Sequence, residues 1–162
     1  MAEENQGNPQ EGQNQQESPV FRLQKLYLKD LSFESPNAPQ VFMEKQEPTV
    51  DINLEVRNRT LENDHWEVTI SVTGTVKNGK EGKTLFIIEV EHAGVFILKN
   101  IPEENIPMAL SVDCPTLMFP FTRQIMSQVS VDGGFMPFLM EPVNFMALYQ
   151  QRQQQQKKEE QN

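Results

Sequence analysis

The chain has 162 residues, enough for one ordinary domain, and its hydrophobic share of 37% is below that of most globular domains. The formal net charge of −9 argues against nucleic acid as a partner, because nucleic-acid-binding surfaces are basic. One cysteine, Cys114, excludes an internal disulfide, and neither a signal peptide nor a run of roughly 20 apolar residues is present, so we expect a cytoplasmic protein without direct membrane insertion.

The two ends of the chain account for the low hydrophobic share. Residues 1–18 are mainly Gln, Asn, Glu and Gly, and residues 150–162 are mainly Gln, Lys and Glu, so neither segment can bury much apolar surface. We therefore expect a disordered polar tail over 1–18, a folding unit over 19–149 and a Gln-rich carboxyl-terminal tail over 150–162.

Four segments alternate apolar and polar residues, which is typical of half-buried β-strands. They cover residues 20–33, 50–57, 66–72 and 84–97. Strict alternation in the first segment puts Phe21 and Leu23 on one face and Leu26 and Leu28 on the other. In the last segment one face carries Ile88, Val90 and His92. The other face carries Ile87, Glu89 and Glu91.

The connections between these strands have their own signals. Two prolines in residues 35–39 exclude a regular strand or helix, so we expect a crossover loop there. A turn is expected at residues 61–64, and the pair Asn78 and Gly79 is the dipeptide best suited to a tight hairpin turn. The economical arrangement is a four-stranded antiparallel sheet.

Helices are expected after the last strand, each with a proline in its first turn, at Pro102, Pro115 and Pro142. The middle helix, from Pro115 to about Val131, is long. It carries an apolar stripe of Met118, Phe121, Ile125, Met126 and Val129. The sequence thus predicts an α+β fold, with a long helix packed on the sheet and short flanking helices.

No motif indicates catalysis, a metal or a cofactor. Residues 79–84 end like a phosphate-binding loop, but the first glycine of that motif is replaced by Lys77, and a hairpin explains the segment without a nucleotide. His65 and His92 have no zinc-ligand spacing, and nothing selects a nucleophile and base pair. We therefore predict that the protein is not an enzyme.

The chain is rich in flexible apolar residues, with eight Met and ten Phe, many of them in residues 41–43, 117–121 and 135–140. One interpretation is that they fill the core. The other is an adaptable binding surface that accepts many sequences. The acidic residues on one strand face also have two interpretations. Glu89 and Glu91 can form a solvated face or a docking surface.

Three segments resemble SecB, the bacterial protein-export chaperone family. Residues 29–39 read KDLSFESPNAP, residues 114–121 read CPTLMFPF and residues 142–148 read PVNFMAL. They are similar to three segments of SecB, occur in the same order and together span roughly Val20 to Tyr149. The resemblance implies a homotetramer, built as a dimer of dimers, that binds unfolded precursor proteins without ATP, keeps them translocation-competent and delivers them to SecA.

The resemblance also assigns residues. The expected SecA-binding surface is Asp30, Glu34, Ile87 and Glu89. The packing between dimers is expected to depend on Ile88, Val90 and His92, where the long helix should lie. The expected client groove contains Val41, Phe42, Val50, Ile52, Leu54 and Phe119.

One departure concerns the groove, because residues 43–47 read MEKQE where many SecB proteins carry a tryptophan. Two alternatives to general export stay open. One is a dedicated SecB-like chaperone of a toxin–antitoxin system, which need not bind SecA; the presence of Asp30, Glu34 and Glu89 favours export over it. The other is a small hydrolase, but no group of catalytic residues in the sequence supports it.

Overall fold

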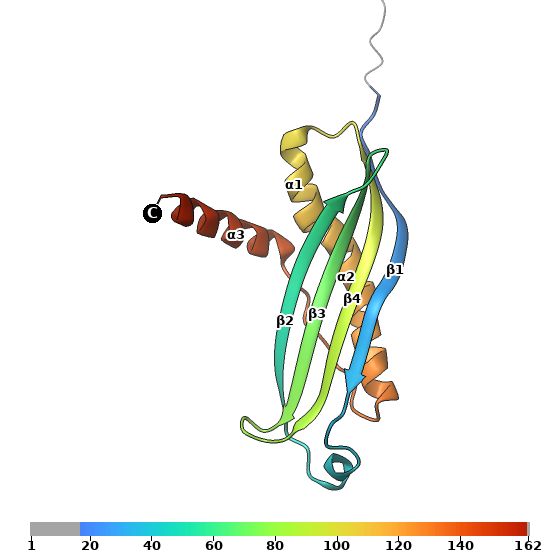
Figure 1. The fold of residues 1–162 in the computed structure, drawn as a ribbon, viewed down its shortest axis with the longest axis vertical. Coiled ribbons are helices and arrows are strands. Elements are labelled where there is room, and N and C mark those ends of the chain that lie inside the picture. The colour runs from blue at the N-terminus through green and yellow to red at the C-terminus, as the bar shows by residue number, and fades with distance from the viewer. Residues whose placement is uncertain (1–16, 162) are drawn as a thin grey trace, which may run out of the picture.

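The computed structural model describes residues 17–161, so most of the predicted amino-terminal tail, residues 1–16, lies outside the described residues. Its centre is a four-stranded antiparallel sheet in the order β1-β4-β3-β2. The strands are β1 (Val20–Glu34), β2 (Pro48–Thr60), β3 (His65–Asn78) and β4 (Thr84–Lys99). Figure 1 shows that one long helix covers one face of the sheet, here called the inner face, and leaves the outer face open. The predicted α+β fold is confirmed.

Strand β1 does not alternate strictly, because its pairing with β4 shifts register between Leu23 and Lys25 and again between Leu28 and Asp30. Each bulge inserts one extra residue and reverses the side on which the following residues point. Six apolar residues of β1 pair with even-numbered, inner-face residues of β4: Phe21, Leu23, Leu26, Leu28, Leu31 and Phe33. The prediction that placed Leu26 and Leu28 opposite Phe21 was therefore wrong.

The connections mostly follow the predictions. Residues 35–39 and a 3-10 turn at Gln40–Met43 carry the chain from β1 at one edge to β2 at the other. Asn63 and Asp64 have positive φ angles of 56° and 60° in the predicted turn. The next connection is a wider loop over residues 79–83, in which Gly79 has a φ of 74°, and not a tight two-residue turn.

The long helix begins earlier than predicted. It runs from a 3-10 turn at Glu103–Asn105 through α1 (Ile106–Met108) and a π-helical stretch at Ala109–Asp113 into α2 (Cys114–Asp132). Pro115 lies inside this helix and does not open it. Because proline lacks an N–H and its ring clashes with the carbonyl of residue i−4, the wider π turn before it gives the ring room.

Helix α2 packs on the sheet through a stripe that differs from the predicted one. Its buried residues recur at steps of three or four: Cys114, Pro115, Met118, Phe119, Thr122, Met126 and Ser130. Phe121, which was expected in the stripe, is half-exposed. The stripe includes Thr122 and Ser130, which a search for apolar residues alone does not select because both are polar. The helix ends at Asp132 and is followed by Gly133, where a side chain would collide with the ring of Phe33.

The carboxyl-terminal region also differs from the prediction. No helix begins at Pro142; residues 136–144 form no regular structure, and α3 (Phe145–Glu160) starts after Asn144, whose side chain accepts a hydrogen bond of 3.0 Å from the Ala147 N–H. The segment 150–160 continues this helix, is fully exposed and projects from the body in Figure 1. Within residues 17–161, every helix is too short or too polar to cross a bilayer.

Candidate functional site

An apolar groove of about 710 Å³ lies beside β2, the edge strand of the sheet. Pro48, Val50, Ile52 and Leu54 of β2 line one side. The segment over 135–143, which runs behind the sheet from α2 towards α3 in Figure 1, lines the other. Val76, Leu85 and Phe86 contribute further apolar surface. Such a groove suits an apolar ligand more than a charged one.

The segment over 135–143 is anchored by some of its side chains and exposes others. Ser130 of α2 accepts hydrogen bonds from the Phe135 N–H at its carbonyl, 3.0 Å, and from the Phe138 N–H at its hydroxyl, 2.8 Å. The rings of Phe135 and Phe86 lie 4.7 Å apart, in the range of favourable aromatic pairs. Met136 and Leu139 remain 81% and 71% exposed. The groove therefore has a fixed wall with two free apolar side chains on it.

The structure brings only part of the predicted client groove together. Val50, Ile52 and Leu54 line it. Phe42 lies beside it, half-exposed, with its ring 5.0 Å from that of Phe135. Val41 and Phe119 are buried in the core and do not line this groove.

The Met and Phe residues of 135–140 stand out in the sequence, but a helix was expected to begin at Pro142. In the structure they form an extended wall of the groove. The signal for this was present, because Pro137 and Pro142 make a helix over 135–143 unfavourable.

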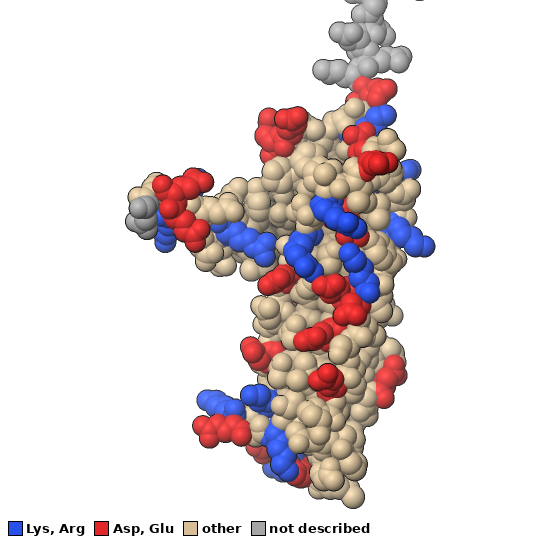
Figure 2. Space-filling view, viewed as in Figure 1, with Lys and Arg blue, Asp and Glu red and all other residues tan. Residues whose placement is uncertain are grey.

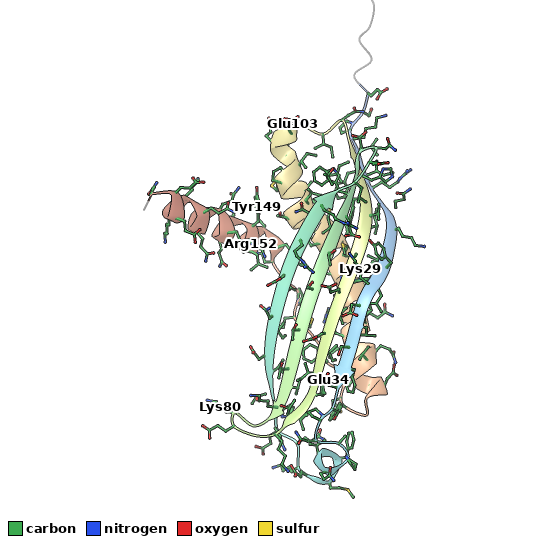
Figure 3. All side chains as sticks on the ribbon, viewed as in Figure 1. Lys29, Glu34, Lys80, Glu103, Tyr149 and Arg152 are labelled. Atoms are coloured by element: carbon green, nitrogen blue, oxygen red, sulfur yellow. The ribbon has the colours of Figure 1, made fainter. Side chains whose placement is uncertain are left out.

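The outer face of the sheet collects the predicted acidic residues. Glu34 pairs with Ile87 across β1 and β4, and Asp30 pairs with Glu91. Glu89 lies opposite Ser32, between these two pairs, and is exposed. Figure 2 shows acidic side chains over this lower half of the outer face, and Figure 3 shows Glu34 at the end of β1. Asp30, Glu34, Ile87 and Glu89 thus share one surface on two adjacent strands.

A second charged cluster lies higher on the outer face, around Glu67 of β3. The Tyr27 hydroxyl, Lys29 Nζ (3.2 Å) and Arg59 Nε (2.9 Å) all donate to its carboxylate. Burial alone would raise the pKa of Glu67, but these hydrogen bonds and the two cations outweigh it and lower the pKa to about 2. This buried carboxylate was not predicted, although an acidic residue within an apolar strand was a signal for it.

The residues expected at the oligomer interface lie in the core of the subunit. Ile88, Val90 and His92 of β4 are 0%, 1% and 4% exposed on the inner face. His92 Nδ1 lies 2.8 Å from the Thr122 hydroxyl of α2, and burial lowers the pKa of His92. His92 therefore contacts the subunit's own helix, and Ile88 and Val90 lie on the same covered face of the sheet.

The remaining reactive groups do not form a site. Cys114 is fully buried, and burial, with a smaller contribution from Asp113, raises its pKa to about 12, which keeps the thiol protonated. Within residues 17–161 no three His, Cys, Asp or Glu side chains are grouped so that they could hold a metal ion.

Comparison with known proteins identifies the family. The family model described as SecB, preprotein translocase subunit SecB, matches residues 14–156. The chain belongs to the SecB family. A protein-export protein SecB from Desulfotalea psychrophila is 62% identical over 133 residues, 82% of this chain and 85% of that protein. A second, from Magnetococcus marinus, is 47% identical over 82% of this chain and 84% of that protein.

The match to SecB extends beyond Val20 to Tyr149, because it also includes residues 14–19 and continues through most of α3, to residue 156. Among solved structures, a SecB-like chaperone of Mycobacterium tuberculosis, in complex with a peptide from an antitoxin, is similar with a TM-score of 0.64. The similarity covers 76% of this chain and 90% of that one at 16% identity, which establishes a shared fold. SecB is a family of export chaperones and not of enzymes.

Proposed function

We propose that this protein is an ATP-independent chaperone of the cytoplasm that binds unfolded precursor proteins, keeps them translocation-competent and delivers them to SecA. The observation that carries the proposal is the apolar groove with its exposed side chains. Val50 and Ile52 on one side are 54% and 42% exposed, and Met136 and Leu139 stand free on the other. Exposed apolar side chains in one groove are typical of a protein interaction site.

The composition of the groove supports a ligand of variable sequence. Its exposed side chains are aliphatic or thioether groups, which make no directional contacts, and methionine adapts to partners of different shape. Unfolded chains expose apolar segments that native proteins bury, so such a groove selects them by their state of folding.

The acidic surface of Asp30, Glu34, Ile87 and Glu89 is the proposed docking site of SecA, whose carboxyl-terminal segment is expected to be basic and to carry its own zinc ion. Three carboxylates on two rigid strands present a fixed charge pattern, which steers a basic segment to one place. Ile87 lies among them half-buried and offers an apolar contact.

The proposed assembly is a homotetramer made as a dimer of dimers. Support comes from apolar side chains on the inner face that α2 leaves uncovered: Phe21, Leu28 and Leu31 of β1 are 39–45% exposed, and Leu117 and Phe121 of α2 are 47% and 50% exposed. Together they form an apolar surface unlike that of an ordinary monomer. Ile88, Val90 and His92 support this surface from beneath α2.

A dedicated chaperone of a toxin–antitoxin system is the second candidate. The structural relative bound to an antitoxin peptide favours it, but at 16% identity that similarity extends only to the fold. The much closer relatives are export proteins, which makes export the first candidate.

The test is refolding of a denatured precursor in the presence of the purified protein. Refolding should be slowed, equally with and without ATP. The double change Val50→Ser and Ile52→Ser should weaken this effect about tenfold, since each removes apolar contact area. Met43→Ser is the matched control, because Met43 is 90% exposed but does not line the groove. Equal loss in the control, or none in the groove variant, rules out the groove as the client site.

A further inference from the structure

The outer face of the sheet is divided into two halves of opposite charge. The acidic half contains Asp30, Glu34, Glu55 and Glu89. The basic half contains Lys29, Arg57 and Arg59. Figure 2 shows a group of blue side chains over the upper part of the face and red ones below them, with a second blue group at the lower end of the molecule. Because Glu55, Arg57 and Arg59 follow each other at steps of two on β2, they point to the same side, and the boundary crosses the strand between Glu55 and Arg57.

A hollow of about 360 Å³ marks the basic half. Its lining consists of Lys29, Arg57, Asn58, Arg59, Glu67, Thr69 and Glu91. The two carboxylates in it differ in exposure. Glu67 is only 6% exposed in its side chain and is occupied by three donors, whereas the side chains of Arg57 and Arg59 are 58% and 65% exposed. Glu91 is 39% exposed. The hollow thus holds one buried carboxylate, one partly exposed carboxylate and two arginines that face the solvent.

The cations keep unused donors. Arg59 bonds Glu67 through Nε, and Arg57 bonds Glu91 and Ser71 through one terminal nitrogen at 2.6 and 3.0 Å. A guanidinium has five N–H groups, so most of these donors have no partner among residues 17–161. Guanidinium forks of this kind match carboxylates in pairs.

We propose that Lys29, Arg57 and Arg59 bind an acidic stretch of the same partner segment whose basic stretch docks on the acidic half. This inference rests on the proposed docking of SecA there and adds that the ligand is bipolar. Glu91, which pairs with Arg57, is two residues from Glu89 on β4, or about 7 Å at 3.3–3.4 Å per residue. A basic and an acidic stretch separated by two to four residues can therefore contact both halves.

A peptide fits this surface better than nucleic acid. The basic half offers three cations next to the carboxylates Glu55, Glu89 and Glu91, which repel a continuous polyanion. A segment that changes its sign of charge meets attraction on both halves. The charge division also fixes the direction in which such a segment lies, since the reversed orientation places like charges together.

The experiment is titration calorimetry of the full chain with three synthetic peptides: a basic block alone, the basic block joined to an acidic block, and the basic block joined to a neutral Gln block. The acidic block should tighten binding about tenfold at low salt, and the gain should fall as salt rises. Arg57→Gln should remove most of this gain. It leaves the bonds of Glu67 untouched, so the variant should fold normally.

Lys80→Gln is the control, because Lys80 lies on the loop at the opposite end of the sheet, as labelled in Figure 3. The two proposals fail differently. If the basic block alone does not bind, the proposed acidic docking site is wrong. The acidic block is then titrated by itself. If Arg57→Gln weakens its binding, the proposed role of the basic half is still supported. The inference is overturned if the acidic block does not tighten binding, or tightens it equally in Arg57→Gln. It is also overturned if a single-stranded oligonucleotide, titrated in the same way, binds more tightly than the acidic block.

Discussion

Neighbouring residues of β4 lie in opposite environments. Ile88, Val90 and His92 are buried on the inner face beneath α2, whereas Glu89 on the outer face is exposed. The two sets alternate along one strand, so each outer position is one residue from an inner one. The difference teaches that the strand has two separable tasks: its inner residues stabilise the subunit, and its outer residues are available to a partner. Substitutions on the two faces should therefore affect different measurements.

The largest effect is expected from a charge on the inner face. Val90→Glu should lower the free energy of unfolding by more than about 4 kcal/mol, because it buries an unpaired carboxylate against α2. Chemical denaturation followed by circular dichroism measures this. Glu89→Gln, one residue away, should change stability by less than about 0.5 kcal/mol. Similar stabilities of the two variants would contradict the division between the faces.

Glu67 is an exception to the difference between the two faces, because it lies on the outer face and is nevertheless buried. Its pKa of about 2 is below the ordinary value, so its ionised form stabilises the fold at neutral pH, and this contribution is lost as the pH falls from about 5 towards 2. We expect Glu67→Gln to destabilise the protein by about 2–3 kcal/mol at pH 7.

The measurement is stability against pH for the two proteins. The difference between them should shrink as the pH falls, since the unmodified carboxylate then becomes protonated. Glu91→Gln is the matched control, because the side chain of Glu91 is 39% exposed and has one cation as a partner. A constant difference from pH 7 to pH 2 would show that Glu67 acts through packing and not through its charge.

The hydrogen bond between β4 and α2 should have a smaller effect. Thr122→Val removes the partner of His92 Nδ1 and should cost about 1–2 kcal/mol, the usual penalty for an unsatisfied buried polar group. Because burial lowers the pKa of His92, neutral His92 stabilises the fold above its ordinary pKa, and this contribution is lost as the pH falls below it. His92→Leu combined with Thr122→Val should recover stability in denaturation experiments. A double variant no more stable than Thr122→Val alone would contradict this account.

The smallest effect is expected at the outer face, on binding. Glu89→Gln should weaken binding of SecA's carboxyl-terminal segment by about 1 kcal/mol, roughly fivefold, and Glu89→Lys by about tenfold or more, because it adds a repulsion. Binding of an unfolded precursor should not change. Titration calorimetry with each ligand tests this, with Glu103→Lys, in the turn that opens the long helix, as the control. Normal SecA binding by Glu89→Lys would exclude the proposed docking face.

Much of the fold could be predicted where a local pattern decides it. The alternation in β4 correctly placed Val90 inward and Glu89 outward, since a strand has a period of two whatever packs on it. The same rule was wrong for β1, because its two bulges are set by pairing with β4. The resemblance to SecB suggested the groove residues. Of these, Val50, Ile52 and Leu54 line the apolar groove of the structure, whereas Val41 and Phe119 lie in the core. Apolar character alone does not distinguish a core residue from a groove residue.

The sequence by itself determined the family, the four strands and the acidic outer face, because these depend on local periodicity and on short characteristic segments. Only the tertiary structure decided which apolar residues are exposed. The extended segment over 135–143 is anchored at Ser130 and lies across from β2, so the groove is made by two segments far apart in the chain. Likewise, Glu67 is ionised although buried, because Lys29 and Arg59 come to it from two other strands. Such contacts depend on distances in space, which no local pattern encodes.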